Sequence, residues 1–230
     1  DRAAQPYVQV LPVFAVAPIS ITNSAELASA ITNQQDGQIW SISPGDYALT
    51  PNSTITAGGQ TGWIMPIVAD NLTINGVGNP TIYGNQYRTN GAWATQDLVA
   101  VFGDNVTING VTLMPSTDNK TLEVIGRDFT LTNSVITPNT KMAASAYDVI
   151  ADPVDRAFAQ QWGGSLYFNG AGNHVITNVT VNNAGISYRY TPADTHITFN
   201  NVNVVHATNI DDINTYRYSS GFNEAGNTVN

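Results

Sequence analysis

The 230-residue sequence contains no cysteine, only eight lysine and arginine residues, and no apolar run of the roughly 20 residues that a bilayer-spanning helix requires. The missing cysteine excludes a small scaffold held by disulfides and leaves the redox compartment undetermined. Against the few basic residues stand 17 acidic ones, which gives a formal net charge of -9 and a pI near 4.4. Such a chain repels nucleic acid and anionic membranes, so we expect neither nucleic-acid binding nor membrane insertion.

Charge of either sign is scarce, because only 11% of the residues are charged while short neutral polar residues are abundant. This composition is more usual outside cells, and we expect a secreted or cell-surface protein. The segment Val8–Ala17 resembles the core of a signal peptide, but Pro12 interrupts it and no basic region precedes it, so we interpret it as a first strand. The length suffices for a sizeable core, and we expect a single domain over residues 1–230.

Five segments of the chain are similar to one another. They begin at Asn71 (NLTINGV), Asn105 (NVTINGVTL), Asp128 (DFTLTNSVI), Asn173 (NHVITNVTV) and His196 (HITFNNVNV). Their starts are 34, 23, 45 and 23 residues apart, which fits β-helix coils of constant length with an enlarged loop or an insertion in two of them. One such unit cannot bury its apolar face alone, so we expect the units to stack around a shared core.

A second short strand accompanies each repeat. The predicted strands are Trp63–Val68, Leu98–Phe102, Thr121–Ile125, Ser165–Phe168, Ile186–Tyr190 and Thr215–Tyr218. Turns rich in Gly, Asn and Asp, where positive φ is tolerated, separate the two strands of a unit. Alternation along the second strands predicts that Ala100, Glu123 and Tyr167 point outward and that their neighbours on both sides point inward.

Asparagine or glycine recurs at one position of successive repeats. The residues are Gly76, Gly110, Asn133, Asn178 and Asn201. One explanation is an internal asparagine ladder, in which side-chain amides are hydrogen-bonded from coil to coil. The other is that both residue types permit a bend of the backbone. The sequence leaves both explanations open.

The two ends of a β-helix expose its core and its strand edges, so each end needs a cover. Residues 23–37 predict a capping helix, with Asn23 as N-cap, Glu26 completing a capping box, and Leu27 and Ile31 on one apolar stripe. At the other end the final GNTVN resembles the start of another repeat. This leaves open that a further chain or fragment completes the C-terminal end.

Residues 137–164 interrupt the repeat and predict a helical insertion. Asp152 and Pro153 resemble a helix start with proline at the first helical position, and Val154, Phe158 and Trp162 follow at helical spacing. The insertion either forms a lid over a groove, which would be functional, or covers exposed core, which would be structural. We favour the second interpretation.

The segment AELASAITNQQDGQIWSISPGDYAL, then NPTIYG at residues 79–84, then the NVTING-like repeats together resemble the pectin-lyase-like superfamily. The resemblance covers roughly residues 18–230 and implies a right-handed parallel β-helix, here of about six coils. Members of this group include polysaccharide lyases, polygalacturonase-like hydrolases and non-catalytic adhesins. The fold alone therefore does not select an activity.

Alternation also predicts a column of outward residues on successive coils, namely Glu123, Tyr167, Arg189 and Arg217. Stacked arginines suit the uronate or sulfate groups of an acidic polysaccharide, which a guanidinium binds through two parallel hydrogen bonds. The predicted substrate-binding residues are Glu123, Tyr167, Tyr188, Tyr190, Tyr216 and Tyr218.

In a lyase of this group, Ca²⁺ acidifies the proton beside the substrate carboxyl group and a basic residue removes it. The resemblance thus implies Asp211 and Asp212 as calcium ligands and Arg189 or Arg217 as the catalytic base. A hydrolase would need paired carboxylates, for which Asp194 is also available. The Gly-His-Gly and Arg-Ile-Lys signatures of polygalacturonase-like enzymes are missing, which disfavours hydrolysis.

Each of these residues also has a structural interpretation. Two adjacent aspartates in a loop are often turn formers, and the arginines are able to pair with Glu123, Asp194 or Glu224 at the surface. The three histidines and four tryptophans show no clustering typical of a metal site or a sugar platform. Two functions follow as expectations. The first is an extracellular protein that binds an extended acidic polysaccharide, with calcium-assisted cleavage left open as an extension of binding, and the second is a non-catalytic surface module that docks on a polymer or cell-wall partner.

Overall fold

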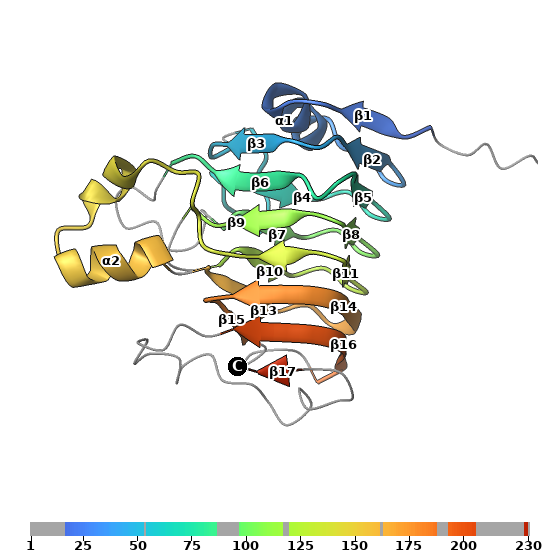
Figure 1. The fold of residues 1–230 in the computed structure, drawn as a ribbon. Helices are drawn as coiled ribbons and strands as arrows, with labels where there is room; N and C mark the ends of the chain where they lie inside the picture. Colours follow the sequence, from blue (N-terminus) through green and yellow to red (C-terminus); the bar gives the residue numbers. More distant parts are fainter. Residues whose placement is uncertain are drawn as a thin grey trace, which may run out of the picture.

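The computed structural model describes residues 17–52, 54–86, 97–116, 120–161, 163–187, 193–205 and 228–229. Within this part of the chain, short strands stack in coils from the N-terminal helix α1 down to β17 (Figure 1). All pairs of named strands are parallel, and each strand pairs with its counterpart one coil further on. The predicted parallel β-helix is confirmed. The strand expected at Val8–Ala17 lies outside the described residues except for Ala17.

Five strands form the first face of the described coils and overlap five of the six predicted second strands; the sixth, Thr215–Tyr218, lies outside the described residues. They are β4 (Met65–Ile67), β7 (Val99–Val101), β10 (Leu122–Val124), β13 (Ser165–Phe168) and β15 (Gly185–Ser187). They make one sheet in the order β15-β13-β10-β7-β4. Consecutive first-face strands are separated in the sequence by a whole coil, so the sheet brings distant residues together.

The second and third faces belong to one twelve-stranded sheet that folds around the coils. The second face contains β1 (Ile19–Ile21), β2 (Ile39–Ile42), β5 (Thr73–Gly76), β8 (Thr107–Asn109) and β11 (Thr130–Thr132). The third contains β3 (Asp46–Leu49), β6 (Thr81–Gly84), β9 (Thr112–Met114), β12 (Val135–Ile136) and β17 (Thr228–Val229). The long strands β14 (Gly172–Asn182) and β16 (Thr195–Val205) run through both faces.

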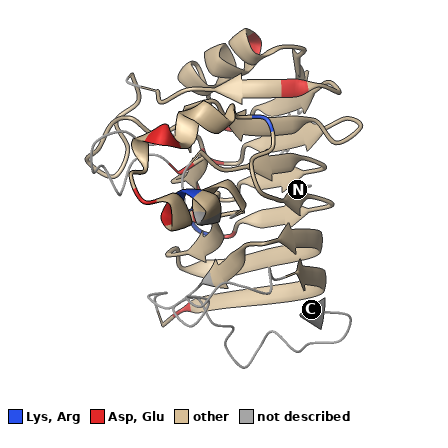
Figure 2. Cartoon of the chain, turned by 60° about the vertical axis from the view of Figure 1, so that its left-hand side comes forward, with Lys and Arg blue, Asp and Glu red and all other residues tan. Residues whose placement is uncertain are grey.

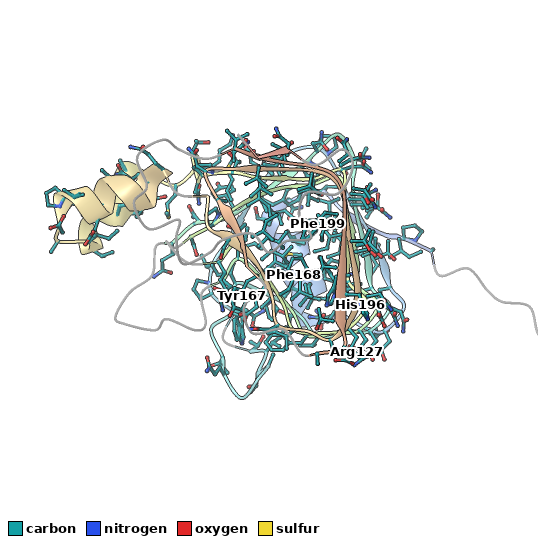
Figure 3. The ribbon with its side chains drawn as sticks, turned by 90° about the horizontal axis from the view of Figure 1, so that it is seen from below. Arg127, Tyr167, Phe168, His196 and Phe199 are labelled. Atoms are coloured by element: carbon teal, nitrogen blue, oxygen red, sulfur yellow. The ribbon has the colours of Figure 1, made fainter. Side chains whose placement is uncertain are left out.

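The core lies inside the coils, where alternate residues of every face meet. On the second face Ile108, Leu131, Ile176 and Phe199 follow one another in register and are almost fully buried. Figure 3, which views the stack along its axis, places Phe168 and Phe199 inside and Tyr167 outside. The predicted alternation of the first-face strands is therefore correct. Charged residues are few over the coils (Figure 2).

The corner between the second and third faces carries the recurring asparagines. Asn133, Asn178 and Asn201 have φ values of 51°, 55° and 51°, so each permits a bend that most side chains avoid. The same residues form a ladder, because Asn178 Nδ2 donates to Asn133 Oδ1 at 3.1 Å and Asn201 Nδ2 donates to Asn178 Oδ1 at 2.9 Å. Both proposed explanations thus apply. The ladder is exposed, however, and the expectation of an internal ladder is wrong.

Helix α1 (Ser24–Thr32) covers the N-terminal end of the stack (Figure 1). Asn23 is its N-cap and accepts a hydrogen bond from the Glu26 amide, while Leu27 and Ile31 enter the core, as predicted. The helix ends at Thr32, before the predicted residue 37, with Asn33 as its C-cap. After it, the Gln34 side chain bonds to the backbone of Pro66, Val68 and Ala69. Among the described helices, none has the length and apolarity needed to cross a membrane.

The insertion contains the 3-10 helix η1 (Ala144–Val149) and the helix α2 (Pro153–Gln161), which projects from the stack (Figure 1). Asp152 caps α2 through its side chain, so the predicted helix start is correct. The predicted apolar stripe is wrong at Val154, which is 75% exposed. Ala159 packs instead against Met142 and Tyr147, in a small core of the insertion itself.

Candidate functional site

Two of the predicted substrate-binding residues lie side by side on the first face. Glu123 of β10 pairs with Tyr167 of β13 although 44 positions separate them in the chain. The backbone of Tyr167 is in register with Ser187 of β15, and Arg189, the next predicted member of the column, lies outside the described residues. The other predicted site residues fall outside the described part of the chain; they are Tyr188, Arg189, Tyr190, Asp211, Asp212, Tyr216, Arg217 and Tyr218.

Three further side chains surround Glu123 and Tyr167. We call the group of Asp97, Lys120, Glu123, Tyr167 and Asn169 the Lys120 cluster. Lys120 Nζ donates to Glu123 Oε2 at 2.8 Å and lies 4.9 Å from the centre of the Tyr167 ring. Asn169 Nδ2 donates to the other oxygen, Glu123 Oε1, at 2.7 Å. Both oxygens of Glu123 are therefore held, and the lysine contacts the carboxylate and the aromatic face together.

Asp97 is the least satisfied member of the Lys120 cluster. It is 1% exposed, and its Oδ2 lies 3.4 Å from Lys120 Nζ without a hydrogen-bond partner. This distance is long for a charge-assisted hydrogen bond, so the contact is a looser electrostatic attraction. Burial, followed by the nearby Glu123 carboxyl, raises the pKa of Asp97 well above its ordinary value. Asp97 thus keeps its proton at a higher pH than an exposed aspartate does.

Lys120 responds to the same surroundings in the opposite sense. Burial lowers its pKa, but the attraction of Asp97 and the hydrogen bond to Glu123 outweigh that effect, and the net shift is upward. Its side chain is only 17% exposed. Lys120 therefore remains a cation that supplies a positive charge and donates hydrogen bonds. Because a raised pKa keeps it protonated, it is a poor general base.

Aromatic residues cover the neighbouring part of the first face. Trp63 and Phe102 meet edge to face with ring centroids 5.3 Å apart, and both pack over Ala100, the outward residue of β7. Trp63 also donates from Nε1 to the Ala57 carbonyl at 3.1 Å. This side of the first face is thereby closed by the segment that precedes β4. Trp63 packs, as expected, and does not present a free ring.

Asp194, the carboxylate considered for hydrolysis, belongs to a different place. It pairs with Arg127 at 3.4 Å, and both side chains are at least half exposed. Figure 3 shows Arg127 at a corner of the coils and Tyr167 on the first face. Asp194 therefore makes its ion pair away from the Lys120 cluster, which disfavours its use beside Glu123.

His174 is a structural residue, consistent with the expectation that it forms no site. It is fully buried, its Nδ1 accepts from the Phe129 amide at 3.2 Å, and its Nε2 lies 3.0 Å from the Gly170 carbonyl. These contacts require the neutral ring with the proton on Nε2. Burial lowers the pKa of His174 below its ordinary value, which also favours the neutral ring.

No group of three His, Cys, Asp or Glu side chains able to hold a metal occurs among the described residues. The predicted calcium ligands, Asp211 and Asp212, lie outside the described residues. A hollow of about 270 Å³ lies between α1 and the segment after β3, with Ala28, Leu49, Asn52 and Ile64 in its wall. It is lined by uncharged residues and offers no acid, base or metal ligand.

Sequence reasoning missed Asp97, Lys120 and Asn169. Asn169 could have been predicted from the alternation, because it follows Tyr167 by two positions and so shares its outward direction. Asp97 and Lys120 precede their strands, where the alternation gives no direction. Compared with known proteins, the chain matches no family model, no curated protein and no solved structure.

Proposed function

We propose that this protein is an extracellular polysaccharide-binding protein that takes an extended sugar chain across the outer side of the first face. The relation to the pectin-lyase-like superfamily is part of the proposal. The observation that carries it is the Lys120 cluster, in which a tyrosine ring, a carboxylate, an amide and an ammonium group converge from neighbouring coils. A site with one aromatic surface and a few fixed polar groups is typical of carbohydrate recognition.

The geometry of parallel coils supports an extended ligand. Strands of one face lie about 4.8 Å apart, so side chains on successive coils form a line across the strands. Glu123 and Tyr167 are two consecutive members of this line. A polymer lying along the stack would meet such residues one after another, whereas a compact ligand would contact only one coil.

An acidic polysaccharide requires positive charge, because the chain as a whole carries a net charge of -9. Lys120 supplies one cation, but Glu123 and Asp97 offset it. Arg189 and Arg217 would add two more, and Ca²⁺ at Asp211 and Asp212 would add others; these four residues stay predictions from the sequence. Cleavage by calcium-assisted elimination is therefore an extension of the binding proposal.

The second candidate is a non-catalytic surface module that docks on a polymer or cell-wall partner. One observation favours it: Asp97 and Glu123 are 1% and 5% exposed, and Glu123 is hydrogen-bonded through both oxygens. Carboxyl groups so enclosed are poorly placed to reach a glycosidic bond. They are well placed to stiffen a binding surface.

Binding and product formation separate these candidates. The protein is titrated with pectate, alginate and chondroitin, with and without calcium, while the absorbance of unsaturated products is followed. Binding together with new absorbance supports the lyase, and binding without product supports the module. Absence of binding to all three polymers contradicts the acidic-polysaccharide proposal in both forms.

A matched pair of variants locates the site. Tyr167→Ala is expected to weaken binding by about tenfold, because an aromatic contact of about 1.4 kcal/mol corresponds to that factor. Tyr83→Ala removes a comparable half-buried tyrosine from β6 on the third face and is expected to leave binding unchanged. Equal losses in the two variants would remove the first face from the proposal.

A further inference from the structure

The outer side of the second face carries two regular columns of side chains. The first column contains Ile39, Thr73, Thr107, Thr130, Val175 and Thr198 on six consecutive coils. The second contains Ser41, Asn75, Asn109, Thr132, Thr177 and Asn200 on six. Members of a column are about 4.8 Å apart, and the columns are separated by two residues of a strand, about 6.6 Å. The face is thus a two-dimensional array made mainly of hydroxyl and amide groups, with Ile39 and Val175 as apolar members of the first column.

Hydrogen bonds between coils hold the second column in place. Asn109 Nδ2 donates to Asn75 Oδ1 at 3.3 Å, and Asn109 Oδ1 accepts from Thr132 Oγ1 at 2.9 Å. Asn200 Nδ2 donates to Thr177 Oγ1 at 3.4 Å. The exposed asparagine ladder runs beside the second column and is joined to it by the Asn133 amide, which donates to Asn109 Oδ1 at 2.8 Å. Side chains fixed in this way lose little conformational entropy when they bind.

The chemistry of the second face excludes several occupants. Its strands contain no Asp, Glu, Lys or Arg, so a charged polymer finds no partner there. Their large aromatic residues, Trp40 and Phe199, are buried in the core, so no ring is presented for stacking on sugar. The columns are mainly polar, whereas the buried centre of an interface between two copies of a chain is mainly apolar. Figure 3 shows no described helix lying over this face.

We propose that the second face binds ice. A crystal of water is a ligand that is uncharged, presents hydrogen-bonding groups at regular intervals, and extends over several coils at once. Each threonine or asparagine contributes little, but a rigid array engages many lattice positions together, so the contributions add through multivalency. This surface is distinct from the Lys120 cluster, and the proposal does not depend on polysaccharide binding.

The test is the growth of ice in the presence of the purified protein. Frozen films of the protein in sucrose solution are annealed just below melting, and the size of the ice grains is compared with that in an inert protein at equal concentration. Thermal hysteresis is measured on single crystals in parallel. We expect smaller grains, faceted crystals and a gap between melting and freezing temperatures. Grain growth equal to that in the inert protein, with round crystals, overturns the proposal.

Two variants of matched chemistry assign the effect to a face. Thr130→Lys places a charged, mobile side chain in the middle of the first column and is expected to abolish most of the inhibition. Thr112→Lys makes the same change at an outward, half-buried threonine of the third face and is expected to retain it. If Thr130→Lys does not fold, as judged by circular dichroism, Thr198→Lys at an exposed member of the same column replaces it. Equal loss in the second-face and third-face variants overturns the assignment.

Other occupants of the second face would give different results. Sedimentation velocity that detects a dimer, which Thr130→Lys converts to a monomer, would assign this face to a second copy of the chain. Binding to an insoluble neutral polysaccharide that Thr130→Lys removes, without any effect of the wild type on ice, would assign it to that polymer. Either outcome contradicts ice binding. Neither affects the result for Tyr167→Ala, so the two proposals fail separately.

Discussion

The first and second faces are built from the same coils but differ in how far their outward side chains are buried. On the first face Ala100 and Glu123 point outward and are nevertheless buried. Trp63 and Phe102 pack over Ala100, and Lys120 and Asn169 hold the two oxygens of Glu123. On the second face the outward threonines and asparagines remain at the surface. The alternation of the strands decides only which residues leave the core. The loops between strands decide which of these residues form an enclosed, charged site.

The largest expected difference between the faces concerns the buried cation. Lys120→Met leaves two buried carboxyl groups without their ammonium partner, and we expect a loss of about 3–5 kcal/mol in the free energy of unfolding. Urea titration measures this loss. Lys141→Met is the control, since its ion pair with Asp46 is more than one third exposed on both sides and is worth at most about 1 kcal/mol. Similar losses for both lysines would mean that the Lys120 cluster is not buried.

A smaller effect is expected at the corner between the second and third faces. Asn178→Ala removes ladder hydrogen bonds and forces a β-carbon into a left-handed conformation, which costs about 1–2 kcal/mol. Asn178→Gly also removes the hydrogen bonds but accepts this conformation. Thermal unfolding of the two variants therefore separates the ladder from the bend. If Asn178→Gly lowers the stability as much as Asn178→Ala does, the loss comes from the ladder hydrogen bonds and not from the left-handed conformation.

The pH dependence of stability provides a third comparison. Because burial lowers the pKa of His174 in the folded protein, folding favours the neutral ring. The stabilisation is fully present above the ordinary histidine value of 6.5 and is lost as pH falls below it toward the lowered value. Denaturant titrations between about pH 7.5 and about pH 5 are expected to show this loss of stability, because histidine titrates in roughly this range.

Substitution of each histidine identifies the source. In His174→Gln the loss on acidification is expected to shrink, because glutamine donates and accepts hydrogen bonds without titrating in this range. His196→Gln changes an exposed histidine of the second face and is expected to retain the loss. A loss on acidification in His174→Gln equal to that of the wild type would contradict the assigned role of His174.

The smallest effect is expected for the exposed ion pair at the corner of the coils. Arg127→Ala removes a contact of 3.4 Å to Asp194 between side chains that are 50% and 62% exposed. We expect a change within about 0.5 kcal/mol in the free energy of unfolding, because solvent screens such pairs. A loss several times larger would show that this corner is as strongly held as the first face.

Much of the fold was predictable, because a β-helix is built from local, repeated signals. Alternation identified the inward residues, and Asn23 with Glu26 identified the start of α1. The register of β15 was not predictable in the same way. Ser187 and Arg189 are two residues apart and leave a strand on the same side, so alternation does not distinguish them.

The rest of the candidate site depends on contacts that carry no period. Lys120 reaches Glu123 from the segment before β10, and Asp97 approaches from the segment before β7. The packing of α2 escaped prediction for a related reason, since its described buried residue, Ala159, packs against Met142 and Tyr147 within the insertion. Sequence patterns describe how a segment folds. Sequence patterns do not predict which loop a segment will contact in the folded protein.

The most direct test of the account is an amide NMR titration of the isotopically labelled protein with a pectate, alginate or chondroitin oligosaccharide. We predict that the side-chain amide of Asn169, on the first face, shifts during the titration. The amides of Asn133, Asn178 and Asn201, beside the second face, are predicted to stay in place. Shifts confined to these three ladder amides, with Asn169 unchanged, would contradict the assignment of the polysaccharide to the first face.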